Sequence, residues 1–118
     1  MEVKYFMAPE EVREFENGKI ELVSIGGKLI GKATFMPGWK WSSHVKPIAK
    51  TDWCEAPHFQ YLISGILHVV MTESGEGVDL KPGSVASIPP GHDAWVVGNE
   101  PVVALDFQGM ADYAKKKA

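Results

Sequence analysis

The sequence contains one cysteine and no long apolar run. Because Cys54 is the only cysteine among the 118 residues, no internal disulfide can form, and a lone thiol favours a reducing compartment. Charged residues interrupt the apolar ones between Met1 and Phe15, and no later segment has the length of a signal-peptide core or a membrane span. We therefore expect a cytoplasmic protein with no membrane partner.

An excess of positive charge is also missing. The chain has 12 Lys and Arg residues against 15 Asp and Glu residues, which gives a formal net charge of −3. Nucleic acids bind basic surfaces, so this balance argues against a nucleic-acid partner. The one basic run, Lys115 to Lys117, lies at the chain end and is interpreted as a solubilising tail. With 45% hydrophobic and 23% charged residues, the composition is that of one globular domain.

Helical periodicity is scarce in the sequence. Only residues 8–17 favour a helix, with Pro9 in the first turn and Gly18 as the stop. Beyond Gly18, short β-rich runs alternate with glycine and proline, which is typical of an antiparallel sandwich or barrel. We expect strands at residues 20–25, 29–36, 59–63, 67–72, 85–88, 95–97 and 102–107.

Glycine marks the predicted turns. Gly26-Gly27 and Ser64-Gly65 predict tight hairpins, and residues 73–77 predict a polar turn. Residues 46–57 have neither a strand nor a helix period, so they predict a long loop of the kind that is often functional. The expected division is an N-terminal segment over 1–18, a β-barrel over 19–109 and a tail over 110–118, whose end forms a short helix or frays.

Two glycine-containing motifs surround three of the four histidines. In the first, five residues separate Gly38 from His44, and six residues separate His58 from Gly65. In the second, Gly83 is followed by five residues and then by Pro-Pro-Gly-His, which ends at His92.

These motifs resemble the two motifs of the cupin family. The first family motif runs Gly, five residues, His, one residue, His, three or four residues, Glu, six residues and Gly. The second runs Gly, five residues, Pro, one residue, Gly, two residues, His, three residues and Asn. The resemblance spans about half of this chain and implies an all-β fold, a cupin or jelly-roll β-barrel, here with a short N-terminal helix. It also implies a metal ion at the barrel mouth.

The family ligands are matched only in part. His58 stands where the family has its glutamate, and eleven residues separate it from the position of the second histidine, where the family has three or four. If that insertion lies ahead of the paired histidines, their positions fall instead on Asp52 and Cys54. Three further positions hold other residues: Lys46 at the second histidine, Ala94 at the last histidine and Gly98 at the asparagine.

Strand geometry suggests how a metal site could still form. Residues two apart on a strand face the same side, so His92 shares a face with the vacant ligand position two residues later. Imidazoles from His44, His58 and His92 would supply three ligands to a divalent transition metal (Fe, Zn, Ni, Mn or Cu) and leave positions open. Asp93 would accept an imidazole N–H, contact the substrate or join the ligands.

Aromatic and amide side chains near the motifs predict a small-molecule site. Gln60 alternates with His58 along one strand and should share its inward face. Trp41 and Trp95, which flank the two motifs with Trp39 and Trp53, would line a cavity for a partly apolar ligand, unless they belong to the core or to a dimer interface. His68 has no motif and is interpreted as a hydrogen-bonded or surface residue. Cys54 is interpreted as an inert thiol, unless the 46–57 loop folds back over the barrel mouth.

Three functions are compatible with these features. The first is a metal-dependent enzyme, of dioxygenase, isomerase or decarboxylase type, that acts on a small organic molecule. The second is a non-catalytic module that binds or senses a small molecule and has a degenerate metal motif. The third is a structural dimerisation unit. Because a small open barrel leaves sheet edges exposed, we also expect a homodimer in which edges pair across a two-fold axis.

Overall fold

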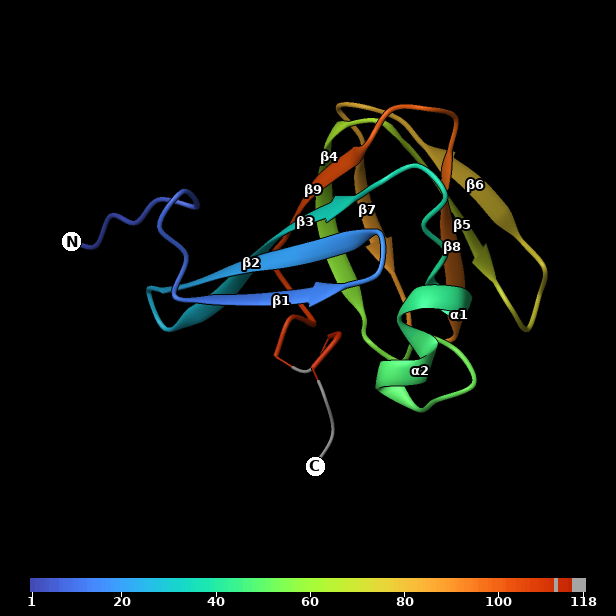
Figure 1. Ribbon diagram of the computed structural model, residues 1–118, viewed down its shortest axis with the longest axis horizontal. Helices are drawn as coiled ribbons and strands as arrows, with labels where there is room; N and C mark the ends of the chain where they lie inside the picture. Colours follow the sequence, from blue (N-terminus) through green and yellow to red (C-terminus); the bar gives the residue numbers. More distant parts are fainter. Residues whose placement is uncertain (112, 116–118) are drawn as a thin grey trace.

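The chain folds into two antiparallel β-sheets that face each other as a barrel (Figure 1). The computed structural model describes residues 1–111 and 113–115. Within these residues, one sheet has the strand order β1-β2-β3-β9-β4-β7 and the other has the order β6-β5-β8. The strands are β1 (Glu11–Phe15), β2 (Gly18–Ile25), β3 (Lys28–Phe35), β4 (His58–Ser64), β5 (Ile66–Met71), β6 (Gly77–Leu80), β7 (Val85–Ile88), β8 (His92–Val97) and β9 (Val102–Asp106).

The all-β prediction is confirmed, and each strand expected from the sequence overlaps a strand of the structure. The hairpin turn at Gly26-Gly27 is confirmed, with positive φ at both glycines. The hairpin predicted at Ser64-Gly65 is wrong, because Gly65, also at positive φ, joins β4 to β5, which lie in different sheets and do not pair. The sequence analysis did not predict β6, a four-residue strand whose first three residues, Gly-Val-Asp, are exposed. Strand β6 pairs with β5 alone and forms the edge of its sheet.

The helix predicted over residues 8–17 is wrong. Residues Glu11–Phe15 form β1, which pairs with β2 through the two-residue loop Glu16-Asn17. Asn17 adopts a left-handed conformation with φ 63°, which asparagine tolerates better than most residues. The Asn-Gly sequence therefore marks a hairpin turn and not a helix stop.

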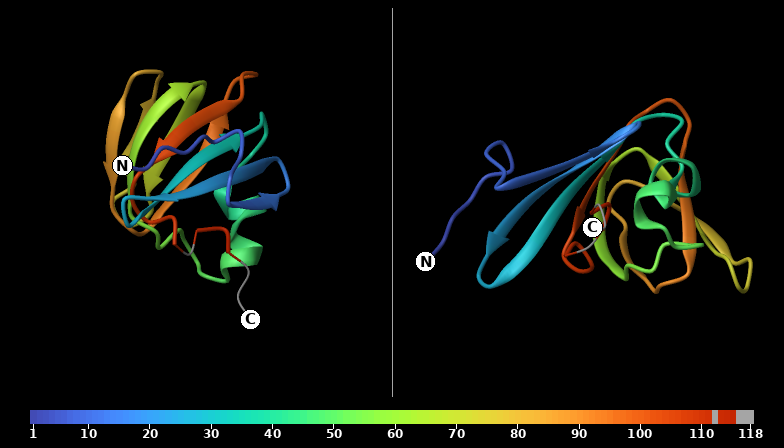
Figure 2. Two further views of the ribbon diagram at one scale, coloured as in Figure 1. Left: turned by 90° about the vertical axis from the view of Figure 1, so that its left-hand side faces the viewer. Right: turned by 60° about the horizontal axis from the view of Figure 1, so that its bottom comes forward.

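The loop predicted over residues 46–57 is partly wrong. Two single-turn helices, α1 (Trp41–His44) and α2 (Lys46–Ala49), precede an irregular stretch that ends at β4. Both helices lie at the same end of the barrel as the red segment that follows β9 (Figures 1 and 2). No helix among the described residues is long and apolar enough to cross a membrane.

The core lies between the two sheets, and the strands bury alternate side chains in it. On β4, for example, Leu62 is 1% exposed, whereas its neighbour Ile63 is 44% exposed and faces outward. Trp39 and Trp41, each 2% exposed, fill the barrel, and Trp39 stacks on Phe35 with ring centroids 3.8 Å apart. Met110 and Tyr113 beyond β9 are also buried, so this part of the C-terminal segment packs against the core.

A substitution at Gly65 tests the packing at the end of the barrel away from the helices. A Cβ at this position would lie 2.5 Å from the carbonyl oxygen of Pro101, and φ is +78°. We expect Gly65→Ala to lower the free energy of unfolding by more than about 2 kcal/mol, since backbone strain and a steric clash add. The matched control is Gly83→Ala, at φ +89° with no atom within 4 Å, which should cost about 1 kcal/mol. Equal losses in urea denaturation would contradict this account.

Candidate metal centre

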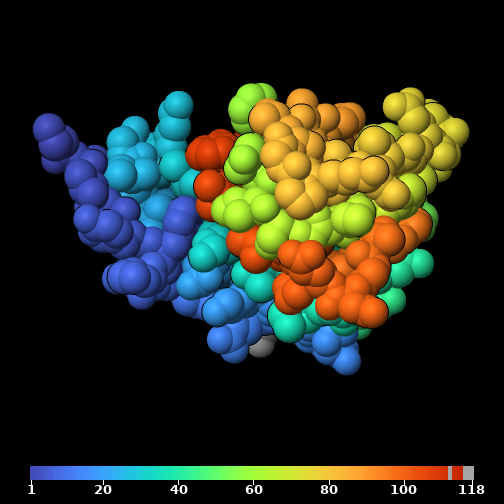
Figure 3. Space-filling view, turned by 90° about the horizontal axis from the view of Figure 1, so that it is seen from above, coloured from blue at the N-terminus to red at the C-terminus, as the bar shows by residue number. Residues whose placement is uncertain are grey.

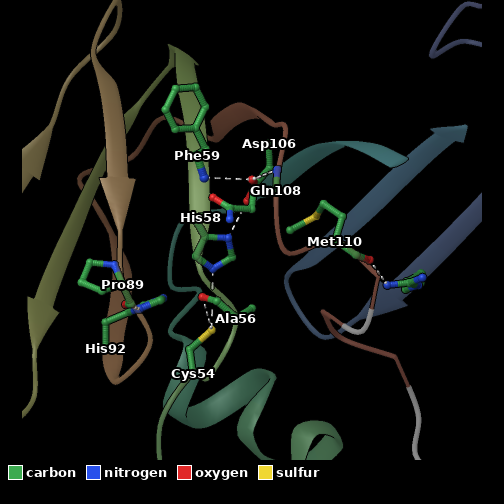
Figure 4. Close-up of polar contacts among 10 residues, drawn as sticks. Cys54, Ala56, His58, Phe59, Pro89, His92, Asp106, Gln108 and Met110 are labelled. Carbon is green, nitrogen blue, oxygen red and sulfur yellow. Dashed lines mark hydrogen bonds and ion pairs between the residues drawn. The ribbon is translucent and has the colours of Figure 1, made fainter. Parts of the chain in front are cut away.

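Three side chains that could together hold a metal ion, here called the metal group, converge at the end of the barrel near the helices. Cys54 precedes β4, His58 is the first residue of β4, and His92 is the first residue of β8. One ligand atom from each lies within 4.8 Å of the other two, and all three residues are buried (Figure 4). The Cys54 sulfur is 3.7 Å from Nε2 of His58.

Backbone hydrogen bonds place Cys54 beside His92. The Cys54 N–H donates to the carbonyl of His92 at 3.0 Å, and the Gly91 N–H donates to the carbonyl of Cys54 at 2.8 Å. This isolated bridge brings the end of the 46–57 segment back over the barrel mouth. Folding of this loop over the mouth is the condition under which the sequence predicts Cys54 as a ligand.

In both histidines of the metal group, one ring nitrogen donates a hydrogen bond to an acceptor. Nδ1 of His58 donates to the Asp106 carboxylate at 2.5 Å, and Nδ1 of His92 donates to the Pro89 carbonyl at 2.8 Å. In a neutral imidazole the remaining nitrogen, Nε2, then carries a lone pair. Histidines that bind metals in proteins typically donate their other N–H to a carboxylate or a backbone carbonyl in this way.

Burial controls the protonation of the group. It raises the pKa of the Cys54 thiol to about 12, and the nearby carboxylates of Glu55, Asp106 and Asp93 add to this effect. Burial, together with the nearby His58, lowers the pKa of His92 to about 4. At neutral pH the His92 ring is therefore uncharged, and the thiol keeps its proton unless a cation displaces it.

The three donors fit a transition-metal ion. A tetrahedral ion with one sulfur ligand at about 2.3 Å and nitrogen ligands at about 2.0–2.1 Å would place sulfur and nitrogen roughly 3.6 Å apart. The distance of 3.7 Å between the Cys54 sulfur and His58 Nε2 agrees with that geometry. Two imidazole nitrogens and a sulfur are also the donor types that such metals prefer.

The structure does not bring His44 to this group. His44 lies at the end of α1, where its Nδ1 accepts a hydrogen bond from the Lys40 N–H at 3.0 Å and its Nε2 is 3.8 Å from the Glu16 carboxylate. The first motif forms a helical turn here and not a strand, so the inward direction expected from strand geometry does not apply. Cys54 occupies the third place in the group.

The other predicted site residues lie in different surroundings. Gln60 is buried on the inward face beside His58, as the alternation predicted, and Trp41 lies inside the barrel. Asp93 accepts hydrogen bonds from the Ser42 and Ala94 N–H groups and so ties α1 to β8.

Trp95 and His68 lie together away from the metal group. Trp95 packs against His68 with ring centroids 4.7 Å apart, and the Lys40 ammonium lies over its ring. The Nδ1 atom of His68 is 2.7 Å from the Asp79 carboxylate, so the hydrogen-bonded role expected for this histidine is confirmed. Aromatic side chains therefore do not surround the site on every side.

Sequence analysis missed two residues of the site, Asp106 and Tyr113. Asp106 is 2% exposed and follows Val102 and Ala104 on the inward face of β9. A charged residue at an inward position of an otherwise apolar alternation is the sequence signal that could have identified it. Tyr113 packs against His58 with ring centroids 5.3 Å apart, and burial raises its pKa well above the usual value. No motif marks Tyr113.

Arg13 holds the segment that carries Tyr113. Its buried guanidinium donates to the carbonyls of Met110 at 2.7 Å, Tyr113 at 2.8 Å and Ala111 at 3.2 Å. The Arg13 Nε–H donates to the Glu11 carboxylate. One arginine on β1 thus fixes the C-terminal segment against the metal group.

Two cavities adjoin the group. The inner one, of about 30 Å³, lies in the barrel beside His58 and Gln60 and has room for about one water molecule. Within the described residues, the buried Nε2 of Gln60 has no hydrogen-bond partner. The outer pocket, of about 280 Å³, opens beside Cys54, and its wall is mostly apolar: Trp41, Val45, Ala49, Thr51, Cys54, Glu55, Ala56, Pro57, Gly109, Ala111, Tyr113, Ala114 and Lys115.

Solved structures with the same fold are known. A cupin-like protein from Thermotoga maritima superposes with a TM-score of 0.58 and 15% identity over 84% of this chain and 74% of that chain. A protein of unknown function from Rhizobium leguminosarum gives a TM-score of 0.57 and 18% identity over 78% and 82%. A mutant of Bacillus subtilis oxalate decarboxylase gives 0.59 and 23% identity over 85% of this chain and 28% of that chain.

These likenesses show a cupin-like fold. No family model matches the chain, and no curated protein matches its sequence.

The lowered pKa of His92 predicts how the stability of the fold depends on pH. Because its pKa is 6.5 before folding and about 4 after folding, the unfolded chain binds the extra proton between these values. The free energy of unfolding should therefore fall as the pH is lowered from about 6.5 to about 4, by up to about 3 kcal/mol. Urea denaturation with a chelator present should show this loss in the wild type and a smaller one in His92→Gln. Identical pH dependence of the two proteins would contradict it.

Proposed function

We propose that this domain binds one transition-metal ion through Cys54, His58 and His92 and holds a small organic molecule beside that ion. The observation that carries the proposal is the orientation of the two imidazoles. Asp106 and Pro89 engage both Nδ1 atoms, so each ring keeps its lone pair on Nε2 in the group that contains the Cys54 sulfur, which lies 3.7 Å from Nε2 of His58. Histidines that bind metals usually show this arrangement, with Nδ1–H donated to a carboxylate or a backbone carbonyl.

The three donor atoms limit the choice of metal ion. A thiolate with two imidazoles suits zinc, iron, nickel or copper, whereas manganese and magnesium prefer oxygen ligands. Manganese is therefore the least favoured of the metals considered from the sequence. The ion would also supply the positive charge that a thiolate needs at a buried position.

Three protein ligands would leave at least one coordination position for another molecule. When bound, such an ion supplies Lewis acidity or redox chemistry to a ligand that reaches it. The outer pocket beside Cys54 is the place for that ligand, because the inner cavity holds no more than a water molecule. Trp41 and Tyr113 line both cavities and would exclude bulk water from the group.

Two activities remain open for this site. An enzyme acting on a small molecule is supported by the open coordination position and by the presence of this fold in a decarboxylase. A non-catalytic binding or sensing domain is supported by the mostly apolar wall of the outer pocket, to which Val45, Ala49 and Pro57 contribute. Turnover of a bound ligand would distinguish the two activities.

Alanine substitutions test the proposed ligands. Because each of the three residues would supply one bond, Cys54→Ala, His58→Ala and His92→Ala should each lower zinc affinity about tenfold or more. The matched controls are His44→Ala and His68→Ala, which should bind zinc like the wild type. Titration calorimetry measures the affinities, and thermal unfolding confirms that each variant folds. A wild type that binds no divalent ion, or a His44→Ala protein as weak as His58→Ala, would contradict the proposal.

Proton release tests the role of the thiol separately. The pKa of Cys54 is about 12 without a cation, so its proton must leave when a metal binds at pH 7.5. Because His92 is already neutral at that pH, it should release none. Calorimetry in buffers of different ionisation enthalpy should give about one additional proton per zinc ion for the wild type relative to Cys54→Ser. The same release from both proteins would show that Cys54 is not a ligand.

A further inference from the structure

The first eight residues, here called the N-terminal arm, are held to the rest of the chain by polar contacts. Lys4 donates to the Glu10 carboxylate at 2.6 Å and also to the Ser24 carbonyl. The Glu2 carboxylate accepts from the Gly26 N–H at 3.1 Å. These contacts attach the arm at the turn between β2 and β3, from which it extends away from the barrel (Figure 2).

The other side of the arm is apolar and uncovered. Val3 and Tyr5 are each 67% exposed, and Met7 is 89% exposed. Val3 lies between Glu2 and Lys4, so the polar contacts of these two neighbours direct its side chain outward. Residues 5–8 then form a turn, in which the Ala8 N–H donates to the Tyr5 carbonyl at 3.1 Å, and Tyr5 and Met7 stay exposed in it. An arm that stays in water would instead expose its charged side chains and cover its apolar ones. Contiguous exposed apolar surface of this kind indicates an interaction site.

A second apolar surface lies on the large sheet. Phe59, Tyr61 and Ile63 alternate along the outward side of β4 and are 41–49% exposed. Val85 on β7, 67% exposed, pairs with Tyr61, and Leu105 on β9 pairs with Tyr61 from the other side. We call this surface, which also includes Phe107, the outer β4 face.

We propose that two copies of the chain form a two-fold symmetric homodimer in which the N-terminal arm of each copy covers the outer β4 face of the other. A two-fold dimer uses the same surfaces of both copies, so one arrangement buries the two apolar surfaces at once. Seen from above, the arm lies at one end of the molecule, and β4 and β7 lie apart from it with other strands between (Figure 3).

The size of the two surfaces favours a second copy as the partner. With their exposed fractions, the apolar residues of the arm and of the outer β4 face offer roughly 1,000 Å² per chain, whereas a stable interface needs about 800 Å² per partner. Neither surface reaches that area alone. This arrangement goes beyond the edge pairing expected from the sequence, because it assigns the contact to a face and an arm.

Light scattering of two matched valine variants tests whether the outer β4 face forms the dimer contact. The wild type at about 100 μM should have twice the 13.0 kDa chain mass. Val85→Glu should be monomeric, because it buries a charge in the contact. Val78→Glu, a 54% exposed valine on β6 of the other sheet, should stay dimeric. A monomeric wild type, or the same mass for both variants, would overturn the proposal.

Mixing two defective proteins tests whether the arms cross between copies. A protein lacking residues 1–7 keeps its outer β4 face, and Val85→Glu keeps its arm, so neither should dimerise alone. Their mixture restores one arm on one intact face, which is half of the proposed contact. At about 100 μM of each protein, sedimentation velocity should therefore show a mixed species that neither protein forms alone and that is weaker than the wild-type dimer, with circular dichroism confirming that both proteins fold. A mixture that remains monomeric while the wild type dimerises would show that the arms do not exchange in this way.

Discussion

The buried hydrogen bond between Asp106 and His58 is the contact on which the rest of the site depends. A carboxylate that is 2% exposed requires several donors, and Asp106 has the His58 ring together with the N–H groups of Phe59 and Gln108. These bonds fix the end of β9 to the start of β4. They also select the tautomer of His58 that keeps its lone pair on Nε2, so one side chain connects the folding of the barrel to the orientation of the group at its mouth.

A second set of contacts closes the site from the C-terminal side. Gly109 follows Gln108 with φ +80°, and a Cβ at this position would lie 2.0 Å from the Pro57 carbonyl oxygen, so the chain can turn here only as glycine. Arg13 then holds the carbonyls beyond the turn, and Tyr113 packs against His58. The segment that Arg13 of β1 holds therefore lines one side of the outer pocket, through Gly109, Ala111 and Tyr113.

The fold was more accessible from the sequence than the site was. Strand runs and glycine turns are local signals, and they predicted the β-barrel and most strand positions. The Asn17-Gly18 turn was also a local signal, but the acidic residues before it favoured a helix. His58 and His92 were found because a motif spacing marks each of them.

The third member of the group could not be identified from the sequence alone. His44 matches a motif position, yet Trp41–His44 form a helical turn that directs its ring toward Lys40 and Glu16. Cys54 reaches the group through a backbone bridge to His92, which is a contact between residues distant in the sequence. Such a bridge has no local pattern, so only the folded chain shows that a thiol, and not a third imidazole, completes the group.

X-ray absorption of the zinc-loaded protein at the metal edge measures the proposed centre most directly. The account predicts one sulfur neighbour at about 2.3 Å and two imidazole nitrogens at about 2.0–2.1 Å, with a further light atom in the open position. The sulfur contribution should disappear in Cys54→Ser. A first shell of nitrogen and oxygen alone in the wild type would contradict the assignment of Cys54, His58 and His92 as one metal centre.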